Sequence, residues 1–172
     1  LEPIKSWAVS EFNFTKSFYY GKNGMIVQLL LVIITFICYI LTRKLKDNGS
    51  IWISGTYHNI FSIANCLTEL GYKILNVVTW AKTNPPPNIS CRYFTYSTEF
   101  IIWARKKEKK PHYFNYDLMK YLNGNKQMTD VWRLSAIAPW EKKCGKHPTQ
   151  KPLALLSRII MASTKPGEWV LD

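Results

Sequence analysis

Apolar positions near the C-terminal end of the chain recur at the spacing of one helical face. They are Leu155, Leu156, Ile159 and Ile160. This spacing predicts a helix, with Thr149 as its N-cap and Pro152 in its first turn, where a missing N–H costs nothing. Pro166-Gly167 should stop the helix. Val170-Leu171 should then enter a buried strand, at whose end Asp172 stands.

Earlier in the chain the pattern alternates between strands and one helix. Strands are expected at residues 50–55, 73–80, 99–105 and 168–172. A helix follows the first strand, with Asn59 as its cap, Gly71 at its end, and this apolar face: Ile60, Phe61, Ile63, Ala64, Leu67 and Leu70. The proline-rich loop 82–88 cannot be regular structure, so the strands on either side of it should pair as a widened antiparallel hairpin. The pattern as a whole predicts an α/β domain.

Residues 25–42 form an uncharged apolar run, whereas residues 1–24 carry no clear period and no secretory signal. The run has the length and hydropathy of a short transmembrane span, and the basic residues that follow it would put its C-terminal side in the cytoplasm. The alternative is a buried strand or helix of a core, with the Ile and Val content favouring a strand and the length a helix. A third explanation is a shifted reading frame, which an intact nucleotide sequence would reject.

Composition narrows the class of protein. The chain has 172 residues, which suits one domain, and a net charge of +12, which indicates an anionic partner. Nucleic acid is the first choice and a membrane surface the second. The four cysteines have no Cys-x-x-Cys spacing, so we expect no zinc site and no disulfide framework, and a reduced cytoplasm fits best. The three histidines are too scattered to indicate a metal.

Several motifs resemble one family in order along the chain. The run His147–Pro152, followed after a helix by Val170-Leu171-Asp172, resembles motif X and the start of motif I in the DNA amino-methyltransferases of the β circular order. The resemblance covers roughly residues 43–172, because residues 48–59 resemble the family's sheet strand, 80–87 motif VIII and 98–104 the return strand. An ordinary helix–strand unit of another α/β protein is the alternative.

This resemblance implies a Rossmann-like methyltransferase sheet with an antiparallel terminal hairpin, and a chain that is incomplete. The family's strand ending in Asp runs into a glycine loop, which would follow Asp172. Its catalytic motif IV should lie before residue 50, and residues 1–49 contain no such tetrapeptide. Asn84-Pro85-Pro86-Pro87 looks similar, but its last residue has no aromatic ring to stack on a base, and its context is motif VIII. We therefore assign no catalytic residue.

The implied activity is transfer of a methyl group from S-adenosylmethionine to N6 of adenine in double-stranded DNA, as in a restriction-modification system. Asp172 would accept from the ammonium of the cofactor, with Thr149 and Lys151 near its methionine end. DNA phosphates would be bound by the basic run, namely Arg105, Lys106, Lys107, Lys109 and Lys110. Asn125 or Gln127 could read an adenine edge. Taken alone, a Lys/Arg run after a strand is more often a solvated surface loop than a DNA-binding segment.

The expected organisation has four parts. Residues 1–42 are an atypical N-terminal segment, 43–105 carry strands and a helix of the catalytic half, 106–146 serve target recognition, and 147–172 hold motif X and the start of motif I. We also expect a cytoplasmic protein without membrane anchorage, and a homodimer is a further hypothesis. The rival function is that of an inactive DNA-binding or membrane-anchored fragment, which the nucleotide sequence beyond Asp172 would distinguish.

Overall fold

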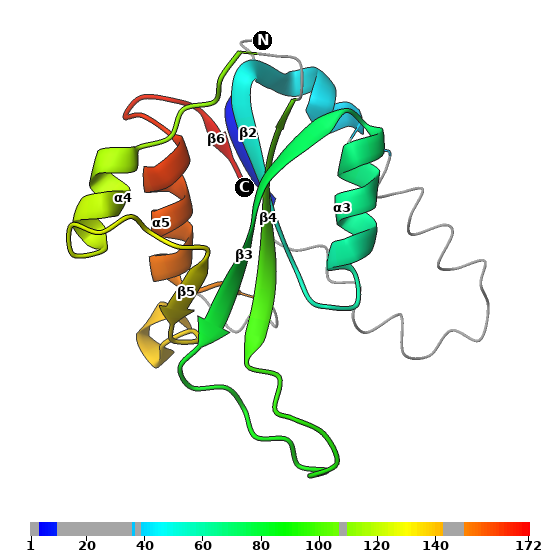
Figure 1. The fold of residues 1–172 in the computed structure, drawn as a ribbon, viewed down its shortest axis with the longest axis vertical. Coiled ribbons are helices and arrows are strands. Elements are labelled where there is room, and N and C mark those ends of the chain that lie inside the picture. Colours follow the sequence, from blue (N-terminus) through cyan, green and yellow to red (C-terminus); the bar gives the residue numbers. More distant parts are fainter. Residues whose placement is uncertain (1–3, 10–35, 37–38, 107–109, 143–149) are drawn as a thin grey trace.

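The computed structural model describes residues 4–9, 36, 39–106, 110–142 and 150–172, with backbone alone for residues 4–9. Its elements alternate along the chain (Figure 1). They are β1 (Ile4–Val9), β2 (Leu45–Gly55), α3 (Ile60–Glu69), β3 (Tyr72–Lys82), β4 (Thr98–Lys106), α4 (Tyr116–Leu122), β5 (Val131–Leu134), the 3-10 helix η1 (Pro139–Lys142), α5 (Leu153–Ser163) and β6 (Val170–Leu171). This order is that of an α/β protein, as the sequence predicts.

The described strands form one sheet in the order β5-β3-β4-β2-β1-β6. β4 runs antiparallel to both of its neighbours, β3 and β2, whereas the other three pairings are parallel. The hairpin predicted from residues 73–80 and 99–105 is confirmed, since Val77 lies opposite Ile102 and Trp80 opposite Glu99. Strand formation at residues 50–55 and 168–172 is confirmed too, although β2 already begins at Leu45 and β6 is confined to Val170–Leu171.

Strand β1 was not predicted, because residues 1–24 show no period of their own. It pairs in parallel with β2 on one side and with β6 on the other. A parallel strand is defined by the two neighbours that supply its hydrogen bonds, so its sequence need not alternate. The segment 1–42, expected to be atypical, therefore contributes a strand between β2 and the edge strand β6.

Helices cover both faces of the sheet, with α3 on one side and α4 and α5 on the other (Figure 1). Successive residues of the central strands alternate between the two layers, as the period of two requires. Ile51, Ile53 and Ile102 pack into the cluster under α3. Trp52, Ile101 and Trp103 pack into the cluster that contains Leu155 and Ile159 of α5.

Stacked indoles form the centre of the layer under α5. The rings of Trp52 and Trp103 lie opposite each other on β2 and β4, with centroids 4.7 Å apart and planes within 9°. The indole N–H of Trp52 donates to Ser163 Oγ at 3.1 Å, which ties the end of α5 to the sheet. Burial of such large rings, with a partner for the N–H of Trp52, stabilises this layer.

Two details of the predicted α3 are wrong. Phe61 was placed on the buried face, but it is 70% exposed, because the buried stripe consists of Ile60, Ile63, Cys66 and Leu67. Asn59 holds the N-cap position without capping the helix, since its Oδ1 accepts from the N–H of Thr56 at 3.0 Å. Gly71 does follow the end of the helix, with a positive φ of 77°.

The last helix and strand also differ in detail from their prediction. In α5, Leu155 and Ile159 are buried as expected, but Ile160 is 41% exposed, because the buried stripe continues through Ala162 instead. Pro152 lies at the N-cap position, just before the helix. β6 was expected to be buried, yet Leu171 is 37% exposed, since β6 stands at the edge of the described sheet.

The apolar run 25–42 falls mostly outside the described residues. Of its members, residues 39–42 are helical and lead through residue 44 into β2. Among the helices that the structure describes, none combines the length and the apolar character that crossing a membrane requires.

Candidate functional site at the carboxyl edge of the sheet

The carboxyl ends of the parallel strands define one edge of the sheet. β2 and β3 both end there, β4 begins there, and the loop 83–97 extends beyond it at the bottom of Figure 1. In open α/β sheets ligands bind outside this edge, because the loops that follow the strands converge there. We therefore take the carboxyl edge as the candidate site.

An ion-paired cluster joins three elements at this edge. Glu99, near the start of β4, accepts from Lys82 Nζ at 2.5 Å through Oε1 and from Lys151 Nζ at 2.6 Å through Oε2. Both ammonium groups lie over the Trp80 ring, at 5.1 and 5.7 Å from its centroid. Lys151 is only 8% exposed. The cluster thus fixes the residues before α5 against the ends of β3 and β4.

Charge rather than burial decides the protonation of this cluster. Burial alone would raise the pKa of Glu99, but the charges and hydrogen bonds of Lys151 and Lys82 outweigh it and hold the pKa below its ordinary value. Glu99 is therefore a carboxylate at neutral pH. The return strand expected from the sequence contained Glu99, but no role was predicted for it, because its partners are far away along the chain.

Aromatic side chains gather beside this cluster. Tyr57, in the turn after β2, stacks on Tyr96 with ring centroids 5.0 Å apart and planes within 11°. Their hydroxyls are hydrogen-bonded at 3.0 Å. His58 lies 3.8 Å from the Tyr57 ring, and Tyr93 5.5 Å from the Tyr96 ring. The turn after β2 and the loop 83–97 are thus joined by a row of rings.

The predicted cofactor residues occupy different places. Asp172 directly follows β6 and is exposed, as expected of a residue at a strand end. Lys151 belongs to the cluster with Glu99, on the far side of β2 and β1 from β6. Along the strand direction, Leu171 of β6 lies level with Ile51 of β2. Glu99 lies farther along, just beyond Gly55, the last residue of β2. The structure therefore does not bring Lys151 beside Asp172, and Thr149 lies outside the described residues.

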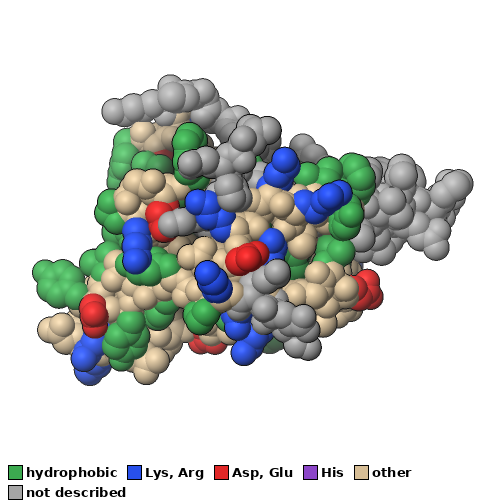
Figure 2. Space-filling model, turned by 90° about the horizontal axis from the view of Figure 1, so that it is seen from above, with side chains coloured by type: hydrophobic (Ala, Val, Ile, Leu, Met, Phe, Trp, Pro, Cys, Tyr) green, Lys and Arg blue, Asp and Glu red, His purple; other side chains and the backbone are tan. Residues whose placement is uncertain are grey.

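The predicted DNA-binding run begins at the opposite, amino edge of the sheet. Arg105 and Lys106 end β4 there, and Lys110 follows, whereas residues 107–109 are not described. Figure 2 views the molecule from this side, and Lys and Arg side chains are spread over it. Lys106 Nζ donates to the carbonyl of Leu45 at 2.6 Å. The structure thus separates this run from the carboxyl edge by the length of β4.

His112 lies near the same amino edge. Its ring meets that of Trp103 edge to face at 4.8 Å. Burial lowers the pKa of its imidazole, and the charges of Arg105 and Lys73 lower it further. At neutral pH this histidine is uncharged, so it adds nothing to the positive charge of that edge.

The two residues predicted to read adenine lie in the turn after α4. Asn125 has a positive φ of 61° and Gln127 is exposed. The side chain of Asn123 donates to the carbonyls of Lys126 and Gln127, so the turn has a fixed backbone. Both side chains are exposed, yet they project from a different part of the molecule than the cluster around Glu99.

Within the described residues no group of histidine, cysteine and acidic side chains could hold a metal ion.

The motif order along the chain and the sheet with one antiparallel strand together fit a Rossmann-like methyltransferase domain. Residues 28–172 match the family described as DNA methylase. This match covers most of the chain, so the protein belongs to that family.

Two curated relatives are similar over three quarters of the chain. Type II methyltransferase M2.MboI of Moraxella bovis is 68% identical over 130 residues, which are 76% of this chain and 48% of that protein. Type II methyltransferase M2.DpnII of Streptococcus pneumoniae is 63% identical over 129 residues, 74% of this chain and 48% of that protein. The chain thus spans about half the length of these relatives.

Solved structures agree on the fold. The M1.HpyAVI–SAM complex matches with a TM-score of 0.69 and 27% identity, over 99% of this chain and 70% of that one. The cytosine-N4-specific PvuII DNA methyltransferase matches with a TM-score of 0.74 over 98% of this chain and 66% of that one. At 17% identity the latter likeness concerns the fold alone.

Proposed function

We propose that the protein transfers a methyl group from S-adenosylmethionine to N6 of adenine in double-stranded DNA, as part of a restriction-modification system. The observation that carries this proposal is the match of residues 28–172 to the DNA methylases. Two further facts support it, namely the similarity to Type II methyltransferases and the structure of M1.HpyAVI with its cofactor.

The cofactor would supply an electrophilic methyl group when bound. Asp172 offers a carboxylate beyond the end of β6, where its charge suits the ammonium of S-adenosylmethionine. The Glu99 cluster, which holds Lys151 and Lys82, would stabilise the part of the edge that faces the DNA. The target base must leave the duplex, because its amino group is otherwise paired.

Asn84, which begins the Asn-Pro-Pro-Pro sequence, connects two segments of the structure. Its Oδ1 accepts from the N–H of Ala136 at 2.8 Å, which joins the loop after β3 to the segment after β5. This bond gives the Asn84 side chain a structural role, because it fixes the direction in which the amide points. This supports the assignment of residues 80–87 to motif VIII rather than motif IV.

The proposal is tested by the product of the reaction. The chain, and a version extended beyond Asp172 by the family's glycine loop, are incubated with duplex DNA and S-adenosylmethionine carrying a labelled methyl group. After digestion to nucleosides, the label should be found in N6-methyladenine with the extended chain. Label in N4-methylcytosine would correct the target base, and no transfer by either chain would favour the inactive DNA-binding fragment.

The basic run should set the salt dependence of DNA binding. Replacing Lys106, Lys107, Lys109 and Lys110 with alanine should flatten the plot of log affinity against log salt, by about 0.9 for each phosphate that the chain no longer neutralises. Lys106 should contribute least, because its ammonium already donates to Leu45. The measurement is fluorescence anisotropy with labelled duplex DNA over a series of salt concentrations. An unchanged slope would make the run a solvated loop.

A homodimer and a cytoplasmic location complete the proposal. The four cysteines have no Cys-x-x-Cys spacing, which suits a reducing compartment. Sedimentation of the purified chain at several concentrations would decide whether it dimerises.

A further inference from the structure

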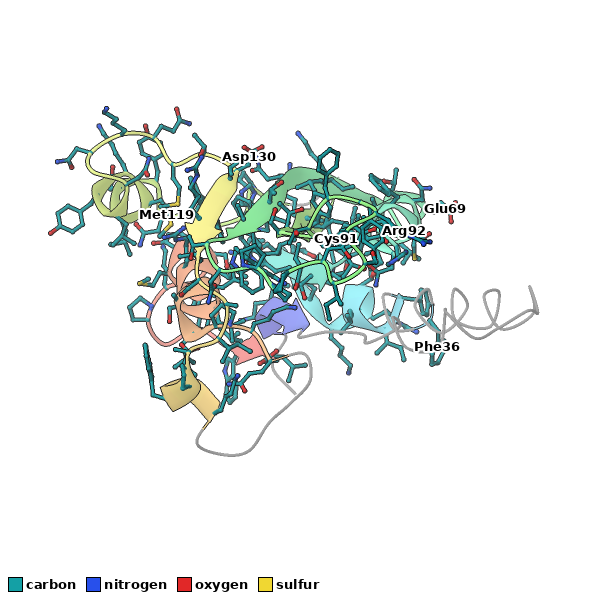
Figure 3. The ribbon with its side chains drawn as sticks, turned by 90° about the horizontal axis from the view of Figure 1, so that it is seen from below. Phe36, Glu69, Cys91, Arg92, Met119 and Asp130 are labelled. Carbon is teal, nitrogen blue, oxygen red and sulfur yellow. The ribbon has the colours of Figure 1, made fainter. Side chains whose placement is uncertain are left out.

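The loop 83–97, which we call the aromatic arm, carries the most exposed apolar side chains of the described residues. Phe94 is 96% exposed and Ile89 95% exposed. In Figure 1 the arm extends away from the sheet below β3 and β4, and Figure 3 shows Cys91 and Arg92 of the arm from below. A large aromatic ring left wholly in water at the tip of a long loop indicates a binding surface more strongly than a single surface leucine does.

Local hydrogen bonds hold the tip of the arm in one shape. The side chain of Asn88 donates to the carbonyl of Tyr93 at 2.6 Å and accepts from both the N–H and the hydroxyl of Ser90. The N–H of Cys91 donates to the carbonyl of Asn88, and Cys91 has a positive φ of 52°. Because the backbone is fixed, Phe94 and Arg92 are presented without much ordering cost on binding.

The row of rings anchors the other side of the arm to the sheet. Tyr96 stacks on Tyr57, whose turn follows β2, and Tyr93 packs against Tyr96. Tyr93 and Tyr96 themselves remain more than half exposed. Single bases and opened base steps stack on flat, exposed aromatic rings of this kind.

The charge of the arm favours DNA over an ordinary protein partner. Residues 83–97 contain Arg92 and no acidic residue, and the whole chain carries a net charge of +12. Glu99, near the root of the arm, is neutralised by Lys82 and Lys151. Apolar rings flanked by positive charge complement bases that are flanked by phosphates.

We propose that the aromatic arm inserts its tip among the bases of the DNA, with Phe94 stacked against a base outside the target position and Arg92 on a neighbouring phosphate. This inference rests on the proposed function, which makes DNA the substrate. The arm lies at the carboxyl edge, so its insertion would hold the duplex open beside the place where the target base must leave it.

The test compares Phe94→Ala with a matched control, Phe61→Ala. Phe61 is 70% exposed on α3 and is not part of the arm. Phe94→Ala should weaken binding of the chain to a short duplex roughly five- to a hundredfold without changing the salt slope, because stacking involves no phosphate. Phe61→Ala should leave affinity unchanged. Arg92→Gln should lower the magnitude of the slope by about one unit.

A fluorescent base reports the insertion itself. In a duplex with 2-aminopurine in place of several adenines, the wild-type chain should raise the fluorescence by unstacking bases, and Phe94→Ala should raise it much less at saturation. Circular dichroism checks that the variants remain folded.

Other outcomes overturn the inference in distinguishable ways. Wild-type binding to DNA with equal affinities for Phe94→Ala and Phe61→Ala would reject the arm but leave the proposed function standing. Absence of DNA binding by the wild-type chain would reject both. A change in sedimentation of Phe94→Ala, with DNA binding intact, would assign the tip to a protein contact instead.

Discussion

Replacing Glu99 with glutamine is expected to lower the free energy of unfolding by about 3 kcal/mol. The variant keeps the shape of the side chain but removes the carboxylate that Lys82 and Lys151 share at 2.5 and 2.6 Å. Two ammonium groups with little exposure would then lie together over the Trp80 ring without that negative charge. Urea denaturation followed by circular dichroism measures the loss.

A matched control and a second variant separate the ion pairs from general effects. Glu69→Gln, at the exposed end of α3, should change the free energy of unfolding by no more than about 0.5 kcal/mol. Lys151→Met should cost less when Glu99→Gln is already present than when it is made alone, since the pair can be broken only once. Equal losses from Glu99→Gln and Glu69→Gln would show that the cluster contributes little.

The stabilisation by Glu99 should depend on pH in one direction. Its pKa is lowered in the folded protein, so its contribution is complete above the ordinary carboxyl pKa of about 4.3. As the pH falls below that value, through the folded pKa, the contribution is lost. The difference in free energy of unfolding between wild type and Glu99→Gln should therefore be constant near neutrality and shrink in acid.

The sequence predicted the part of the fold that local pattern determines. The hairpin of β3 and β4 could be predicted because both strands are rich in apolar and β-branched residues and flank a loop that prolines keep irregular. β1 could not, since its pairing with β2 and β6 is decided by distant segments. Phe61 and Ile160 were misplaced because periodicity marks a wider face than the one that meets the sheet.

The candidate site was predictable only as far as its motifs. Asp172 was expected at a strand end, and it follows β6. The contact between Lys151 and Glu99 joins residues 52 positions apart, and no local pattern reveals such a pair. The basic run was expected to bind DNA phosphates, and its first members, Arg105 and Lys106, end β4 at the amino edge. The antiparallel direction of β4, which the predicted hairpin already implied, decides this position.

Asp172→Ala should weaken S-adenosylmethionine ten- to a hundredfold in a chain extended through the family's glycine loop. A carboxylate beyond the end of a strand can accept from the cationic ammonium of the cofactor, and such charge-assisted bonds are worth about 1.5–3 kcal/mol. At about 1.4 kcal/mol per decade this corresponds to the expected loss of affinity. The 172-residue chain should bind the cofactor weakly or not at all, because that loop would enclose it.

Calorimetric titration of S-adenosylmethionine into the extended wild-type chain, its Asp172→Ala variant and the control Asp117→Ala tests the cofactor site most directly. Asp117 is an exposed aspartate in the first turn of α4, away from the end of β6. We predict unchanged affinity for Asp117→Ala and a ten- to hundredfold loss for Asp172→Ala. Equal affinities for all three proteins, or tight binding by the 172-residue chain, would contradict the assignment of this edge to the cofactor.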